Sequence, residues 1–274
     1  MKKITFIVAL IVIYNFFNLA ETVIAKEITN IQWKKSVAKG KKLSNFRETV
    51  TSPALGKKAW KITLLPKDCG RDNDGNYSDC KNNGKDAVVG HGGGDRARSE
   101  YQSPKKFTGE KWISVSIFIP EDFKTVEPVS TSLFQIYEWG NTNQQRHPRM
   151  MLKVKRGNLE PRYFAVNGMD SPGIIHKRLF IDNMRGKWTT IIFHANMTKD
   201  PLKGFVKMYV NGELYNDYQG RTGYGGKFYN KFGIYHSWIS RWTEVYGEYP
   251  TQVVYYDNLF RTNSKKKLLK LIQN

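Results

Sequence analysis

The chain of 274 residues carries little negative charge, because 24 aspartates and glutamates stand against 44 lysines and arginines, for a formal net charge of +20. An excess of this size favours binding to polyanions and does not bear on the fold. Hydrophobic residues make up 40% of the chain and aromatic residues 14%, which is enough to build a core and excludes disorder as the reason for the charge. We therefore expect an acidic partner: nucleic acid, an anionic membrane surface or an acidic polysaccharide.

Long hydrophobic runs are absent after residue 25, so no later segment is expected to span a membrane. The long apolar run at residues 4–20 follows two lysines and leads to small and apolar residues at positions 23–25. This order is typical of a secretory signal peptide, and we predict that residues 1–25 are removed. An uncleaved membrane anchor is the alternative, although Asn15 and Asn18 interrupt the run.

Removal of residues 1–25 leaves almost all of the positive charge on the mature domain. A secreted or periplasmic protein rarely meets cellular DNA, so we expect no nucleic acid partner, and no membrane partner after cleavage. An acidic polysaccharide then remains as the expected partner. Neither a linker nor an internal repeat divides residues 26–274, so we predict one domain and a monomer.

Cysteine is scarce, and the two cysteines, Cys69 and Cys80, lie close together in the sequence. Their spacing does not fit a zinc site, which would need two further ligands at suitable intervals. In an oxidising compartment we predict a disulfide that closes the segment between them. The segment is rich in aspartate and asparagine, so bound calcium is the alternative to a solvated loop, although Tyr77 and Asn83 stand where an EF-hand loop needs glycine and glutamate.

Long helical patterns are also absent, since glycine, proline, asparagine and aspartate interrupt the apolar stretches. This favours an all-β domain, built as a sandwich. Asn211 and Gly212 predict a hairpin turn, because both tolerate the positive φ that such turns need, and residues 265–272 predict one short basic helix. The expected strands cover residues 59–65, 111–119, 132–139, 150–155, 188–196, 205–210, 227–237 and 252–261.

Three strand segments place polar side chains in rows on one face, because side chains two apart in a strand point the same way. The rows are Arg96, Arg98 and Glu100; Gln135 and Tyr137; and Tyr229, Lys231 and Tyr235. In the second and third segments, the intervening positions are mostly apolar and would face a core, and Gly233 would leave room between its neighbours. Such faces suit a groove that holds an anionic chain, and ordinary solvated faces are the alternative.

The same segments resemble the motifs of the β-jelly-roll polysaccharide lyases, a superfamily that includes alginate lyases, glucuronan lyases and heparin lyase I. Alginate lyases carry Arg-x-Glu, Gln-Ile-His and Tyr-Phe-Lys-Ala-Gly-x-Tyr motifs in this order. The matching segments here are 98–100, 135–137 and 229–235, and the resemblance extends over about residues 59–261. Further landmarks, among them Gly186-Lys187-Trp188, resemble the heparin-lyase-I-like branch most.

The resemblance implies a concanavalin-like jelly roll of two antiparallel sheets and a secreted enzyme that cleaves a uronate-containing glycan by β-elimination. This reaction removes the proton at C5 and expels the oxygen at C4, so it needs a neutralised carboxylate, a base and an acid. The resemblance implies that Tyr235 is the acid, that Arg98 and Gln135 hold the carboxylate, and that Lys231 acts beside Tyr235. The other motif residues are expected to bind substrate: Arg96, Glu100, Tyr137 and Tyr229.

The base remains open, because Tyr137 stands where the alginate lyases have a histidine. We prefer His91, since its flanking glycines allow close approach of a ligand and glucuronan-lyase-like relatives place a catalytic histidine early in the chain. His194, which shares a strand face with Asn196, is the other candidate and is expected to contact substrate. We expect this chemistry to require no cofactor. Calcium is the one ion that we consider as a ligand of the chain.

The expected substrates are glucuronan, heparin or heparan sulfate, and alginate. The main alternative is a lectin-like module that binds an acidic glycan without cleaving it, since a fold does not determine chemistry. A third hypothesis is a basic protein that attaches to anionic surfaces through residues 265–267. A glycoside hydrolase is disfavoured because it needs two carboxylates across the bond, and the motifs offer only Glu100 and Glu138 for that pair.

Overall fold

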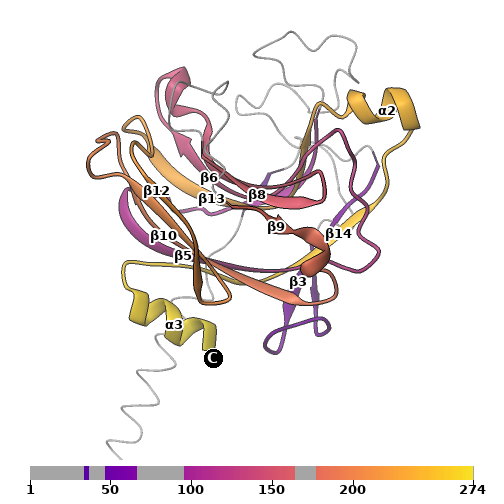
Figure 1. Cartoon of the computed structure of the whole chain (residues 1–274), viewed down its shortest axis with the longest axis horizontal. Coiled ribbons are helices and arrows are strands. Elements are labelled where there is room, and N and C mark those ends of the chain that lie inside the picture. The colour runs from indigo at the N-terminus through magenta and orange to yellow at the C-terminus, as the bar shows by residue number, and fades with distance from the viewer. Residues whose placement is uncertain (1–33, 37–46, 67–95, 164–176, 274) are drawn as a thin grey trace, which may run out of the picture. The chain divides into compact units, whose positions relative to one another are not determined.

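The computed structural model describes residues 34–36, 47–66, 96–163 and 177–273, all within the compact unit Lys34–Asn274. These residues form two seven-stranded sheets, here named sheet A and sheet B, that stack as two layers (Figure 1). All pairings between the described strands are antiparallel. The predicted all-β sandwich of two antiparallel sheets is confirmed.

Sheet A carries all three motif segments on neighbouring strands. In spatial order it contains β1 (Lys34–Ser36), β4 (Arg96–Gln102), β13 (Lys227–Ser237), β6 (Thr131–Trp139), β7 (Pro148–Lys155), β8 (Asn158–Tyr163) and β9 (Leu179–Phe180). The last motif strand, β13, thus lies between the first two, β4 and β6. Segments that are far apart in the sequence, such as Lys227 and Trp139, are joined by direct strand pairing.

Sheet B forms the other layer. In spatial order it contains β12 (Glu213–Gln219), β11 (Phe205–Val210), β10 (Trp188–Met197), β5 (Gly109–Phe118), β14 (Gln252–Thr262), β3 (Ala59–Leu64) and β2 (Arg47–Val50). The turn between β11 and β12 is made by Asn211 and Gly212 with φ values of 49° and 96°. The predicted hairpin is therefore confirmed, and its two positive φ values match the twist of the strands it joins.

The core lies between the sheets and follows the alternation of the strands. On β5, Ile113, Val115 and Ile117 are at most 1% exposed, as the period-two pattern predicts. Phe134 of sheet A stacks on Phe193 of sheet B with ring centroids 5.7 Å apart. This contact identifies the inner face of each sheet, so the neighbours Gln135 and His194 face away from the core.

Two β-bulges shape the centre of sheet A. One lies in β6 between Ser132 and Phe134, and the other in β13 between Phe232 and Tyr235. Inside each bulge a carbonyl accepts a hydrogen bond from the hydroxyl of Tyr256, a fully buried residue of sheet B: Leu133 O at 3.0 Å and Gly233 O at 2.9 Å. The irregular strand pairing leaves both carbonyl groups in the core. The single hydroxyl proton is shared between them or donated to one at a time.

Gly233 serves a different purpose from the one expected. Its φ is +126°, and a Cβ atom there would lie 2.2 Å from the Ser99 carbonyl oxygen of the neighbouring strand β4. The glycine is needed for the backbone approach of β4 and β13 rather than to make room between side chains. It therefore helps to set the spacing of the strands that carry the motif residues.

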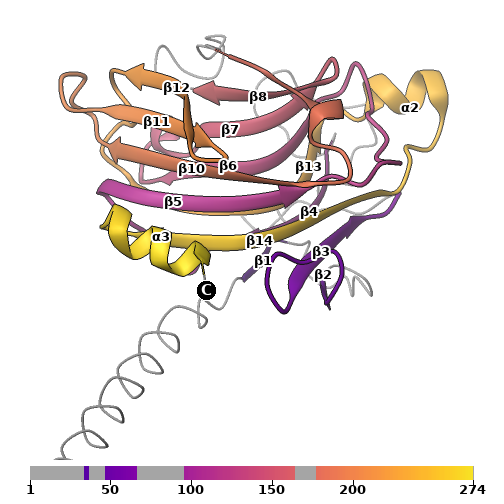
Figure 2. The same ribbon diagram turned by 60° about the horizontal axis from the view of Figure 1, so that its bottom comes forward.

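The helices of the described residues are few and short. The predicted C-terminal helix is confirmed as α3 (Lys265–Gln273), which packs Leu268 against sheet B beside β5 and β14 (Figure 2). The helix α2 (Ser240–Tyr246) and the 3₁₀ turns η1 (Asn143–Gln145) and η2 (Ile181–Asn183) lie in connections. Among the described residues, no helix is both long and apolar enough to cross a bilayer.

Candidate active site

The motif side chains meet on the outer face of sheet A, the face turned away from sheet B. Strand register places Lys231 of β13 opposite Gln135 of β6, and Tyr235 of β13 opposite Arg98 of β4. Opposed residues in a sheet project to the same side. The predicted residues Arg98, Gln135, Lys231 and Tyr235 are thus brought together by three adjacent strands, and we call this outer face of sheet A the groove face.

Glu100 lies at the centre of this group and is 1% exposed. Its carboxylate accepts hydrogen bonds from Gln135 Nε2 at 2.5 Å, Lys231 Nζ at 2.6 Å and Arg98 Nη1 at 3.4 Å. A buried carboxylate is tolerated when charged donors surround it in this way. Glu100 was predicted to bind substrate, but its position assigns it instead to holding the three side chains around it.

Tyr235 is the most exposed of the central residues, and two cations lie near its ring. The Arg98 guanidinium carbon is 4.7 Å from the ring centroid, and Lys231 Nζ is 5.9 Å from it. Arg98 and Lys231 are 6% and 5% exposed, whereas Tyr235 is partly open to solvent. Arg96 precedes this group on the same face of β4 and is opposite Ser237. A reacting group that reaches the site would therefore meet the tyrosine with cations beside it.

Tyr137 and Tyr229 were predicted to contact substrate, and the structure places both almost entirely inside, at 7% exposed each. Their rings pack together with centroids 5.2 Å apart, and the Tyr137 hydroxyl donates to Arg146 O at 2.5 Å. Burial raises the pKa of Tyr229 far above its ordinary value, and the neighbouring Tyr137 and Glu100 raise it further. Tyr229 therefore stays protonated and is not available as a base.

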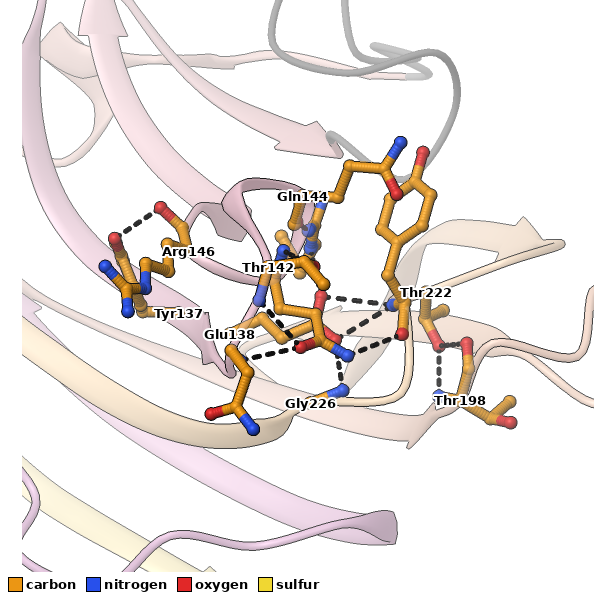
Figure 3. Close-up of polar contacts among 12 residues, drawn as sticks. Tyr137, Glu138, Thr142, Gln144, Arg146, Thr198, Thr222 and Gly226 are labelled. Atoms are coloured by element: carbon orange, nitrogen blue, oxygen red, sulfur yellow. Dashed lines mark hydrogen bonds and ion pairs between the residues drawn. The ribbon is translucent and has the colours of Figure 1, made fainter. Parts of the chain in front are cut away.

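A second buried carboxylate, Glu138, lies on β6 and points to the opposite face of sheet A from Glu100. It accepts hydrogen bonds from Arg149 Nε at 2.5 Å and from the backbone N–H groups of Tyr224 and Gly226 at 2.9 and 2.6 Å (Figure 3). Glu138 lies three residues from Gln135 in a regular stretch of β6, so the two side chains point to opposite sides of sheet A. Glu100 and Glu138 therefore do not flank one glycosidic bond, as hydrolysis would require.

His194 does not join the site, which corrects the expectation that it contacts substrate there. It lies on β10, on the outer side of sheet B, where its ring stacks on Trp112 at 4.0 Å and its Nε2 is 2.6 Å from Glu110 Oε1. Sequence alternation placed it on the same strand face as Asn196, in agreement with its register on β10. It did not reveal which of the two sheets that strand belongs to.

Several predicted residues lie outside the described residues, namely His91, Cys69 and Cys80, together with the aspartate-rich segment considered for calcium. Their predicted roles stay predictions. Within the described ranges there is no group of three or more histidine, cysteine, aspartate or glutamate side chains suited to a metal ion.

The groove face also extends beyond the motif residues. Ser132 is opposite Tyr235 on one side and Lys153 of β7 on the other, while Met151 is opposite both Gln135 and Arg162 of β8. The alternation of Lys153 and Lys155 in β7 was the available signal for this extension. Strand β8 was not predicted because it contains Pro161, and proline is unusual in a strand. Proline is tolerated here because β9 no longer pairs with β8 at this position.

Solved structures with this fold include enzymes that act on polysaccharides. An endo-β-1,4-glucuronan lyase from the fungus Trichoderma reesei is 15% identical, with a TM-score of 0.54 over 85% of this chain and 94% of that one. A family 7 alginate lyase bound to product is 11% identical, with a TM-score of 0.56 over 85% and 95% of the two chains. The catalytic domain of a glycoside hydrolase family 131 protein from Coprinopsis cinerea is 11% identical, with a TM-score of 0.53 over 85% and 84%.

Identities this low show the shared fold, a jelly roll, and leave the chemistry to other observations. No curated protein sequence matches the chain. The sequence profile of a family described as polysaccharide lyase matches residues 26–260, which include all three motif strands. The chain therefore belongs to the polysaccharide lyase family.

Proposed function

We propose that this polysaccharide lyase is an exported enzyme that cleaves a uronate-containing glycan by β-elimination. The observation that carries the proposal is the meeting of Arg98, Gln135 and Tyr235 on one face of sheet A, with Lys231 between them. Two of the structural neighbours are a glucuronan lyase and an alginate lyase by name, which supports an acidic substrate.

The first step is neutralisation of the uronate carboxylate. Arg98 supplies a guanidinium and Gln135 an amide donor, and Glu100 fixes both by accepting hydrogen bonds from them. An arginine has five donors and a glutamine amide two, and Glu100 accepts a hydrogen bond from one donor of each side chain. Neutralising the carboxylate stabilises the negative charge that develops when the C5 proton leaves, so it accelerates the elimination.

The second step is proton transfer at C5 and at the leaving oxygen of C4. Tyr235 is partly open to the groove and lies beside Arg98 and Lys231, so it is our candidate for the acid that protonates the leaving oxygen. We assign the base to His91, on the sequence resemblance alone. Lys231 binds the negative charge of the substrate next to the tyrosine.

The finer assignments are also proposals. The tyrosine at position 137 and the Lys231–Tyr235 spacing favour the heparin-lyase-I-like branch, with glucuronan, heparin or heparan sulfate, and alginate as the substrates to compare. We further propose a signal peptide over residues 1–25, secretion or a periplasmic location, a Cys69–Cys80 disulfide, and a monomer that needs no cofactor. A calcium ion in the loop between the cysteines is the alternative there.

The test is to incubate the protein, expressed without residues 1–25, with each polymer and follow ultraviolet absorbance from the C4–C5 double bond of the product. Absorbance with at least one uronate polymer is expected. Retention of a polymer without any product would instead support the lectin-like alternative. Absence of absorbance across a broad panel of uronate polymers would overturn the proposed reaction.

A further inference from the structure

A group of charged residues lies on the groove face two to three strands away from the proposed catalytic residues. We call it the β7–β8 cluster, and it consists of Lys153, Lys155, Glu160, Arg162 and the nearby Arg178. Register connects it to the site in two rows. One row runs Lys231, Gln135, Met151, Arg162, and the other runs Tyr235, Ser132, Lys153, Glu160.

These rows give the separation between the two groups. Neighbouring strands lie about 4.8 Å apart, so Lys153 is about 10 Å from Tyr235 and Arg162 is about 14 Å from Lys231 along the sheet. Ser132 lies between Tyr235 and Lys153, is 2% exposed, and has a buried Oγ without a hydrogen-bond partner among the described residues. A chain that crosses the strands from Tyr235 would therefore pass Ser132 and reach the cluster.

The cluster has more positive charge than its own carboxylate neutralises. Glu160 is 3% exposed, lies 3.3 Å from Arg178 Nε, and is opposite Lys153 in the sheet. Arg162 has no carboxylate partner within the described residues, and its Nε is buried without a hydrogen bond. A buried charged donor without an acceptor is unfavourable, so an acceptor supplied by a ligand would be favourable at this guanidinium.

Lys153 also has more positive than negative charge around it. Its pKa is lowered to about 8, chiefly by burial and then by the charges of Arg162 and Lys155, against the opposing effect of Glu160. Neighbouring cations that destabilise one another in this way would be relieved by an anion between them.

We propose that Arg162 and Lys153 form an anion subsite that binds a carboxylate or sulfate group on a sugar unit other than the one being cleaved. Arginine suits such a group because its planar guanidinium matches two oxygens at once. The inference rests on the proposed function, because it takes the glycan to run from Tyr235 across β6 and β7. Its consequence is that the enzyme selects a polymer with repeated negative charge, and that short fragments which do not reach β8 bind less well.

The test compares Arg162→Gln and Lys153→Gln with a matched control, Lys187→Gln, which removes one positive charge from an exposed position before β10. With the best polymer, we expect each cluster variant to raise KM about tenfold, the loss of roughly one charge-assisted hydrogen bond, with a smaller effect on kcat. Arg162→Lys should recover part of the loss. The control should match the original protein, and thermal unfolding should show that all four variants are folded.

Comparison of substrates shows whether the subsite binds a carboxylate or a sulfate group. A rise in KM with unsulfated glucuronan or alginate assigns the subsite to a carboxylate, and a rise confined to heparin or heparan sulfate assigns it to a sulfate. A KM for Arg162→Gln equal to that of the original protein on every cleaved polymer would overturn the subsite while leaving the proposed lyase reaction intact.

If the original protein cleaves none of these polymers, the proposed reaction fails and the subsite is judged by binding alone. Titration of the protein with each polymer at fixed salt then supplies the comparison. Weaker binding by Arg162→Gln than by Lys187→Gln supports the subsite, and equal binding overturns it.

Discussion

Each face of sheet A buries a carboxylate. The hydrogen-bond partners of the two show which carboxylate stabilises the fold and which one positions the side chains of the candidate site. Glu138 on the inner side is 0% exposed and is satisfied by Arg149 and by two backbone N–H groups. Glu100 on the groove face is 1% exposed and is satisfied by the side chains of Arg98, Gln135 and Lys231. Burial is therefore the same, but the partners differ.

The partners decide what each carboxylate does. Glu138 fixes the backbone of the connection that leads from β12 into β13, so its contribution is to stability. Glu100 fixes the side chains of the proposed catalytic residues on the groove face, so its contribution is to the geometry of the site. His236 and Tyr235 repeat the contrast on β13: the histidine is 1% exposed and bonded to Gln252 across the core, while the tyrosine is partly open.

The largest effect is expected on the groove face from Tyr235→Phe, which removes only the hydroxyl. Loss of an acid in the transition state costs about 10²–10⁴-fold in rate, so kcat should fall about a thousandfold while glycan binding changes little. Steady-state kinetics with the best polymer, together with titration of the polymer, measure both quantities. Near-normal turnover would remove Tyr235 from its role.

The substitution His91→Gln tests whether His91, which lies outside the described residues, is the base of the reaction. If His91 takes the C5 proton, kcat should fall about a hundredfold or more, with thermal unfolding unchanged. Full activity in this variant would return the role of base to Tyr235 itself.

Glu100→Gln and Glu138→Gln test the comparison directly, because the same change is made on the two faces. Glu138→Gln breaks a buried pair with Arg149 and should lower the free energy of unfolding by about 3–5 kcal/mol. Glu100→Gln should lower kcat/KM about a hundredfold through misplaced Arg98 and Lys231, with a smaller loss of stability, because the side chains of these partners are slightly more exposed than that of Arg149. Urea unfolding and steady-state kinetics on both variants measure the free energy of unfolding and kcat/KM. The contrast would be wrong if Glu100→Gln lost only stability and Glu138→Gln only activity.

The smallest effect concerns pH and the inner face of β13. Burial lowers the pKa of His236 to about 4, so the folded protein excludes the protonated form that the unfolded chain adopts below about 6.5. The free energy of unfolding should therefore be at its full value above pH 6.5 and fall by about 1.4 kcal/mol per pH unit between pH 6.5 and 4, about 3 kcal/mol in total. Urea unfolding of the original protein and of His236→Asn measures it. Identical pH dependence in the two proteins would contradict the assignment.

Much of the fold was predictable from the sequence because its signals are local. The alternation in β5, the Asn211–Gly212 turn and the apolar strand β10 each appear within a dozen residues, and all were confirmed. The strands that escaped prediction lack such signals: β1, β2 and β9 are only three, four and two residues long, and β8 contains Pro161.

The candidate site was predictable only where neighbouring residues share a strand. The rows on β4, β6 and β13 could be found one by one, but their order in sheet A depends on pairing between distant segments. For this reason His194 was expected to contact substrate although its strand belongs to the other sheet, and the contacts of Glu100 became visible only with its three partners. The Tyr256 hydroxyl, which reaches into two bulges from the other sheet, has no local signal at all.

The most direct test of the central claim is the mass of the cleavage products from a defined uronate oligosaccharide. Elimination makes the fragment that carries the new non-reducing end lighter by one water than hydrolysis would, because a C4–C5 double bond replaces the added hydroxyl. The arrangement of Arg98, Gln135 and Tyr235 predicts this lighter, unsaturated fragment, and predicts its loss in Tyr235→Phe. Saturated fragments of the hydrolytic mass would contradict the account.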